Sequence, residues 1–204
     1  MEGEKTMSSR EKILERLRNN TRETYDMPDL GSLNPTTFSD PVAEFIKKTT
    51  TTAGAKLIEM KTDDNLNGLI RQAYPDVTTV ASNLPGVKAD VNPDTAADAK
   101  ELMKVDVGVI EGKIGVAENA CIWIPQQMKE KSACFAVQRL IVVLSHDAIV
   151  SNMHEAYARI AASQEYFQQY KFGTFISGPS KTADIESALV YGAQAARALT
   201  VILR

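Results

Sequence analysis

The sequence has 204 residues, of which 44% are hydrophobic and 24% charged, enough to bury one sizeable core. Its 26 acidic and 23 basic residues give a net charge of -3. No dense run of Lys or Arg suits a polyanion, so nucleic acid is not an expected partner. The longest apolar stretch, Leu140–Leu144, is far shorter than the roughly 20 residues that cross a bilayer, and the amino end lacks a signal-peptide core. These features predict a soluble, cytoplasmic protein with no membrane partner.

The cysteines and histidines are too few and too scattered for a metal or cluster site. Cys121 and Cys134 lie among apolar neighbours and form no C-x-x-C pair, which excludes a disulfide framework or an iron–sulfur motif in this chain. His146 and His154 have no acids or cysteines at metal-ligand spacing. We expect no metal, and the sequence leaves any other cofactor unknown.

The amino end predicts a tail, a helix and an arm. Residues 1–7 have no periodicity and are expected to be a disordered or artificial tail, whereas residues 8–204 are expected to form a single domain. Ser8 and Glu11 have the spacing of a capping box and precede apolar residues at helical spacing. Residues 19–39 contain prolines and no clear period, so we expect them to run as an ordered or mobile arm over the body of the protein.

The rest of the chain alternates between helix and strand patterns. The first part predicts a helix capped by Asp40, a strand at Lys56–Met60, a helix capped by Asp63 and a strand at Val77–Ala81. A helix at Asp94–Met103, a strand at Val107–Ile110 and a hairpin of Ile114–Ala117 and Cys121–Ile124 should follow. The last part predicts a strand at Leu140–Leu144, a helix at Asn152–Lys171, a strand at Phe172–Ile176, a helix beginning near Thr182 and a strand at Leu199–Leu203. Repeated strand–helix–strand units predict an α/β fold with an open, mainly parallel sheet and helices on both faces.

The turn after Phe172–Ile176 is the first candidate site, because ligands of open parallel sheets usually bind beyond the carboxyl ends of the strands. Free amides and the dipole of the predicted helix start, with nearby hydroxyls and one ammonium group, suit a phosphate or carboxylate. Acidic residues in the first helical turn would interact favourably with the helix dipole, or they could accept a hydrogen bond from a substrate hydroxyl. The candidate ligand-binding residues are Gly178, Pro179, Ser180, Lys181, Thr182, Asp184 and Glu186. A capped helix without a ligand fits the same pattern.

The hairpin carries the second candidate. Glu118 and Asn119 interrupt two apolar strands, and a charge placed there needs a partner or a function. An exposed position in the turn is the alternative.

These two segments resemble a known family. The run Ile176–Glu186 closely resembles the signature of the LutC/YkgG proteins, which carry the lactate-utilisation or LUD domain. Gly115–Ala120 is similar to the family's Ala-Glu-Thr-Gly-Thr segment, with Glu118 at its glutamate, and Ser9–Leu14 is similar to its first helix. Asn119 and Ala120 replace Thr-Gly, and Gly192–Ala196 stands where many members have Gly-Val-His-Gly-Pro.

The resemblance implies a NagB/RpiA/CoA transferase-like, Rossmann-like fold, shared with ribose-phosphate isomerase and CoA transferases. It also implies a small subunit without clusters that acts with an iron–sulfur subunit and a cysteine-rich subunit in oxidising L-lactate to pyruvate. The leading expectation is therefore an accessory subunit that binds a small carboxylate or phosphate.

Two alternatives remain open at this point. One is a stand-alone isomerase or acyl/CoA-transfer enzyme with Glu118 as catalytic base or nucleophile. The other is a non-catalytic scaffold that binds partner subunits. The sequence does not decide whether the chain is catalytic, which ligand it takes or its oligomeric state.

Overall fold

The computed structural model describes residues 7–23, 25–163, 172–184 and 187–204. Its contacts divide the chain into two compact units, Met1–Asn34 and Pro35–Arg204. The single domain over residues 8–204 stays a prediction. None of the helices in the described ranges combines the length and apolar character that a membrane span requires.

The first unit contains one regular helix, α1 (Ser9–Asn20), and a short 3-10 turn, η1 (Leu30–Ser32). The predicted capping box is confirmed, because the Ser8 side chain accepts from the Glu11 amide while the Glu11 carboxylate accepts from the Ser8 amide. No residue of α1 is buried. The helix is therefore stabilised by its cap and its own backbone rather than by packing within this unit.

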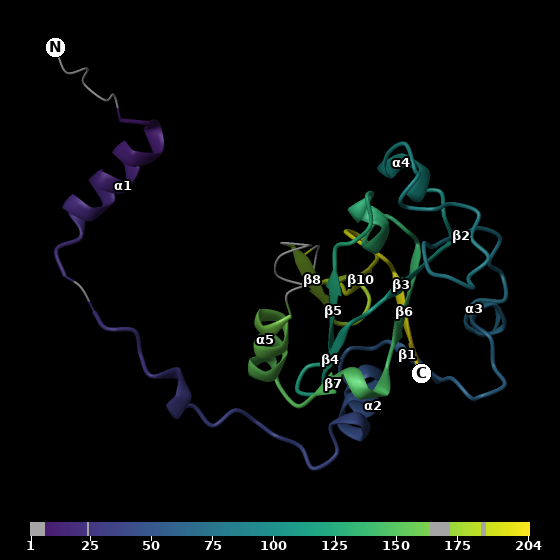
Figure 1. The fold of residues 1–204 in the computed structure, drawn as a ribbon. Coiled ribbons are helices and arrows are strands. Elements are labelled where there is room, and N and C mark those ends of the chain that lie inside the picture. The colour runs from purple at the N-terminus through teal and green to yellow at the C-terminus, as the bar shows by residue number, and fades with distance from the viewer. Residues whose placement is uncertain (1–6, 24, 164–171, 185–186) are drawn as a thin grey trace. The chain divides into compact units, whose positions relative to one another are not determined.

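A five-stranded parallel sheet forms the centre of the second unit (Figure 1). Its strands, in spatial order, are β1 (Lys56–Glu59), β11 (Ala198–Leu203), β6 (Arg139–Leu144), β3 (Val107–Glu111) and β2 (Val80–Ala81). All four neighbouring pairs are parallel. This confirms the predicted α/β fold with a mainly parallel open sheet, and the continuous apolar runs of β6 and β11 reflect burial on both faces.

A second sheet of four strands packs on one face of the first. It contains β7 (Ile149–Val150), β4 (Ile114–Val116), β5 (Cys121–Pro125) and β8 (Gly173–Ile176) in that spatial order. The predicted hairpin is confirmed, since β4 and β5 pair antiparallel. The strand β8 also pairs antiparallel with β5, so it belongs to this sheet and not to the central one.

Helices complete the layers on both faces of the central sheet. The helix α3 (Leu66–Ala73) covers one face, whereas α2 (Pro41–Thr51) and the small sheet cover the other. The helix α5 (Met153–Ala162) packs on the outer face of the small sheet. In Figure 1 these layers lie in the order α3, central sheet, small sheet, α5.

Several predicted helix boundaries were wrong. Asn65, not Asp63, caps α3, since its side chain accepts from the Gly68 amide. The helix predicted over Asp94–Met103 is reduced to α4 (Ala99–Leu102), because Asp94 instead accepts from the Lys129 amide and holds an irregular turn. The helix predicted at Asn152–Lys171 begins as expected but ends at Ala162, and residues 164–171 lie outside the described residues.

The remaining short elements are η2 (Lys131–Cys134), η3 (His146–Ala148), β9 (Lys181–Thr182) and β10 (Val190–Tyr191).

Candidate functional site

The turn after β8 leads into a strand and not into a helix. Lys181 and Thr182 form β9, which pairs antiparallel with β10. Ser180 is paired on both sides, because its amide donates to Ala196 at 2.9 Å and its carbonyl accepts from Gly192 at 3.0 Å. The predicted helix start near Thr182 was therefore wrong for the residues that the structure describes, and a helix dipole cannot contribute to a site there. Glu186 lies outside the described residues.

Position 178 requires glycine for two reasons, which are its backbone conformation and its closeness to Ala53. Its φ of 73° is in the left-handed region, and a Cβ placed on it would lie 2.2 Å from the carbonyl oxygen of Ala53. The Lys181 ammonium donates to that same oxygen at 2.7 Å. Gly178 thus packs directly on the loop between α2 and β1, and Lys181 forms a hydrogen bond to the same loop. The next residue, Pro179, is buried.

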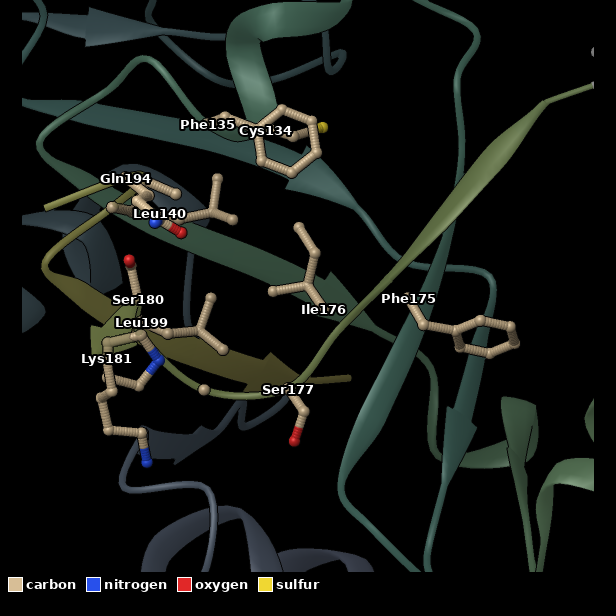
Figure 2. A pocket seen from close by; sticks show the side chains of 14 residues that line it. Cys134, Phe135, Leu140, Phe175, Ile176, Ser177, Ser180, Lys181, Gln194 and Leu199 are labelled. Carbon is tan, nitrogen blue, oxygen red and sulfur yellow. The ribbon is translucent and has the colours of Figure 1, made fainter. Parts of the chain in front are cut away.

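A cavity of about 390 Å³ opens beside this turn. Ser177, Gly178, Pro179, Ser180 and Lys181 line one side, so five consecutive residues of the turn contribute to a single cavity. Figure 2 shows the Lys181 ammonium pointing away from the apolar side chains of the cavity. Those apolar residues include Phe135, Leu140, Ile176 and Leu199, and Cys134 and Gln194 complete the rim.

The cavity lies at the opposite edge of the central sheet from the one predicted. Leu140 and Leu199 are the second residues of β6 and β11, so the cavity is next to the amino ends of these strands. The reason is that β8 belongs to the small sheet. The turn follows the carboxyl end of β8, but that end faces the amino ends of the central strands.

Glu118 lies in the turn between β4 and β5, at the start of α5. Its carboxylate Oε1 accepts from the Met153 amide at 3.2 Å, a position where the helix dipole favours negative charge. Its carbonyl oxygen accepts from the Lys48 ammonium at 2.9 Å. Glu118 is half-buried and is not among the residues that line the cavity.

Asn119 connects the two predicted segments. Its carbonyl oxygen accepts from the Ser177 hydroxyl at 2.8 Å, while its side-chain oxygen accepts from the Cys121 amide at 3.0 Å. Ser177 also lines the cavity, so the Glu118–Asn119 turn and the Gly178 turn are neighbours. Burial raises the pKa of the Cys121 thiol, and the nearby Glu118 charge raises this pKa further, against the hydrogen bond from Ser177 that lowers it.

Ala120 has a backbone conformation that favours glycine. Its φ is 55°, a left-handed conformation unusual for a residue with a side chain. Glycine occupies this position in the similar segment, which is the residue that adopts such a φ without strain.

Lys48 and Gln194 were not found from the sequence. Lys48 lies on α2, half-buried, with its ammonium 5.1 Å from the centre of the Phe38 ring and 3.5 Å from Glu44. Its approach to Glu118 depends on the packing of α2 against the small sheet, which no local pattern records. Gln194 lies in the Gly192–Ala196 segment, which departs from the family pattern, and that departure was the only sequence signal at this position.

The last two predicted residues lie at the outer end of the turn. The Thr182 hydroxyl is 3.3 Å from a carboxylate oxygen of the exposed Asp184, and neither residue lines the cavity. In the described part of the chain, no group of three or more His, Cys, Asp or Glu side chains is arranged to hold a metal ion.

Comparison with known proteins gave one family and one related structure. The family model of the LUD domain matches residues 88–203 of the chain. A crystal structure of a DUF162 family protein from Deinococcus radiodurans is similar with a TM-score of 0.64 and 20% sequence identity, over 83% of this chain and 99% of that one. A search of curated proteins found no match. The structural likeness supports the fold, and the domain match covers more than half of the residues and both turns of the site. The chain belongs to the LUD domain family.

Proposed function

We propose that this protein is a LutC-type accessory subunit of a lactate utilisation system, in which it binds a small carboxylate or phosphate beside the Gly178–Thr182 turn. Membership of the LUD domain family supports a role related to lactate utilisation. The similarity of Ile176–Glu186 to the LutC/YkgG signature supports the narrower assignment.

The observation that carries the proposal is the cavity built by the signature residues. Its volume of about 390 Å³ is within the range of small-molecule sites. Ser177, Ser180 and Gln194 offer hydroxyl and amide groups at its rim. Lys181 has three donors, of which the bond to Ala53 uses one. Because its ammonium points away from the apolar side chains of the cavity, the anionic group of the ligand would lie on the Lys181 side of the turn (Figure 2).

The electron-transfer partners would be an iron–sulfur subunit and a cysteine-rich subunit in the cytoplasm. This chain has two cysteines, of which Cys134 is buried and Cys121 half-buried. Cluster ligation is then left to the partners, and the role of this chain is to hold a ligand near them.

A thermal-shift screen of the wild type and Lys181→Ala tests the ligand. Lactate, pyruvate, sugar phosphates, CoA and nucleotides are the probes. A ligand at 100 times its dissociation constant stabilises by about 2.7 kcal/mol. A stabilisation that is lost in Lys181→Ala but kept in Lys104→Ala, the same change at another exposed lysine, supports the proposal. No response to any probe would favour a scaffold that binds only protein partners.

The cellular role is tested by complementation. A strain that lacks the gene should regain growth on L-lactate with the wild-type protein, and the tagged protein should co-purify with an iron–sulfur subunit. The double variant Lys181→Ala/Glu118→Gln should restore growth poorly although it is folded and abundant. Full growth with this variant and an unchanged ligand response would contradict the proposal.

A second candidate is an isomerase or acyl-transfer enzyme that uses Glu118. It is favoured by the position of the Glu118 carboxylate, half-buried at a helix start with a hydrogen bond to one oxygen. Peptide mass spectrometry after incubation with acyl-CoA substrates would detect an adduct on Glu118. An unmodified Glu118, with ligand binding retained, leaves the accessory role as the better account.

A further inference from the structure

Two further cavities lie at the carboxyl edge of the central sheet. One cavity of about 300 Å³ is bounded by Arg204, Glu111 and Val143, and a neighbouring one of about 190 Å³ is bounded by Glu111 and Asn83. They share the wall formed by Leu84, Pro85 and Glu111. This is the edge at which open parallel sheets usually bind ligands. It is also the opposite edge from the cavity at Gly178.

The Glu111 carboxylate, which lines both cavities, pairs with two cations, of which Arg204 lines the larger cavity and Lys113 lines neither. Glu111, the last residue of β3, accepts from the Arg204 guanidinium at 2.7 Å and from the Lys113 ammonium at 2.5 Å. The side chains of Glu111 and Lys113 are 26% and 27% exposed, so both are partly withdrawn from water. The cluster has a formal net charge of +1 because two cations oppose one anion.

Both cations keep donors that this pairing does not use. A guanidinium has five N–H groups and an ammonium has three, whereas each donates a single hydrogen bond to Glu111. Glu111 therefore fixes the two cations without satisfying them. Such an arrangement is suited to an incoming anion, because the ordering of long side chains is already complete before binding.

The opposite wall of the cavities is also held in place. Asn67 of α3 donates to the Gly86 carbonyl and accepts from the Lys88 amide, both at 2.8 Å. Ser82 donates to the Val109 carbonyl at 2.8 Å and accepts from the Leu84 amide at 3.1 Å. The loop after β2 is thus pinned at both ends, which keeps its apolar residues opposite the charged cluster.

We propose that this carboxyl-edge pocket binds the carboxylate or phosphate group of a small organic molecule, with Arg204 and Lys113 as the anion-binding residues and Glu111 as their positioning residue. The apolar wall at Leu84 and Pro85 receives the rest of the molecule. This site is separate from the one proposed beside Gly178 and does not depend on it.

Isothermal titration of the full chain at constant ionic strength tests the pocket, with inorganic phosphate and propionate as separate probes. Arg204→Gln and Lys113→Gln should each weaken binding of at least one probe about ten-fold or more, because each removes a charged donor. Arg71→Gln and Lys104→Gln, matched changes at exposed positions elsewhere, should not. The probe that responds distinguishes a phosphate site from a carboxylate site.

Glu111→Gln separates an anion site from a surface ion-pair cluster. The glutamine keeps one oxygen that can accept a hydrogen bond from the cations and removes the negative charge that competes with the ligand, so binding should weaken less than in Arg204→Gln. Loss of binding in Lys181→Ala with full binding in Arg204→Gln would place the anion at the other edge and overturn this inference. The inference would also be overturned if the wild type bound both probes with dissociation constants above about 10 mM.

Discussion

Replacement of Gly178 by alanine should destabilise the protein much more than replacement of Gly86, although both glycines have left-handed backbones. Their φ angles are 73° and 84°. An alanine with such a φ costs about 1 kcal/mol at either position. At Gly86 no atom lies within 4 Å of the added Cβ, so this conformational cost is the whole expected effect.

At Gly178 the added Cβ would meet the Ala53 carbonyl oxygen at 2.2 Å, which forces the turn away from the loop between α2 and β1. Overpacking of this kind costs about 1–3 kcal/mol, so Gly178→Ala should lose about 2–4 kcal/mol in total. Urea denaturation with both the midpoint and the m-value measures the two variants on one scale. Equal free energies of unfolding for Gly178→Ala and Gly86→Ala would show that the close approach to Ala53 is not stabilising and would refute the reasoning.

Two further predictions concern the caps and charges outside the site. Hydrogen bonds from Thr78 and Thr79 lower the pKa of the Asp106 carboxyl to about 2, so the stabilisation that it gives is complete above its ordinary pKa near 3.8 and is lost as the pH falls toward 2. Asp106→Asn should therefore be less stable than the wild type at pH 7, and the difference should shrink near pH 2 in denaturant titrations; a constant difference would argue against this role. Ser8→Ala removes the capping box of α1, which should reduce amide protection in the first turn of that helix by hydrogen exchange while the main unfolding midpoint stays unchanged, because α1 buries no side chain. A lower midpoint in this variant would show that α1 packs on another surface.

Local signals made most of the fold predictable. The Asp40–Pro41 cap, the capping box at Ser8 and the β4–β5 hairpin depend on residues a few positions apart, and the structure contains all three. The start of α3 was misplaced because three consecutive polar residues can each cap a helix. Asp64 instead accepts from the Lys61 amide, which leaves Asn65 as the cap.

The site was less predictable because its geometry depends on pairing between distant segments. The residues after Ser180 have a helix-like polar start, but the pairing of β9 with β10 overrides it. Likewise, the sequence of β8 does not reveal that it pairs with β5, and this pairing moves the Gly178 turn to the other edge of the central sheet. The contact between Asn119 and Ser177 spans 58 residues and has no local signature.

The position of β11 also determines when the central sheet can close during synthesis. This strand lies between β1 and β6, although residues 198–203 leave the ribosome after the other strands that the structure describes. Until then β1 and β6 each present an unpaired edge, and such edges invite intermolecular pairing. A nascent chain stalled before Ala198 would therefore lack the centre of its sheet rather than a dispensable border, and it would depend on chaperones or on rapid release to avoid aggregation.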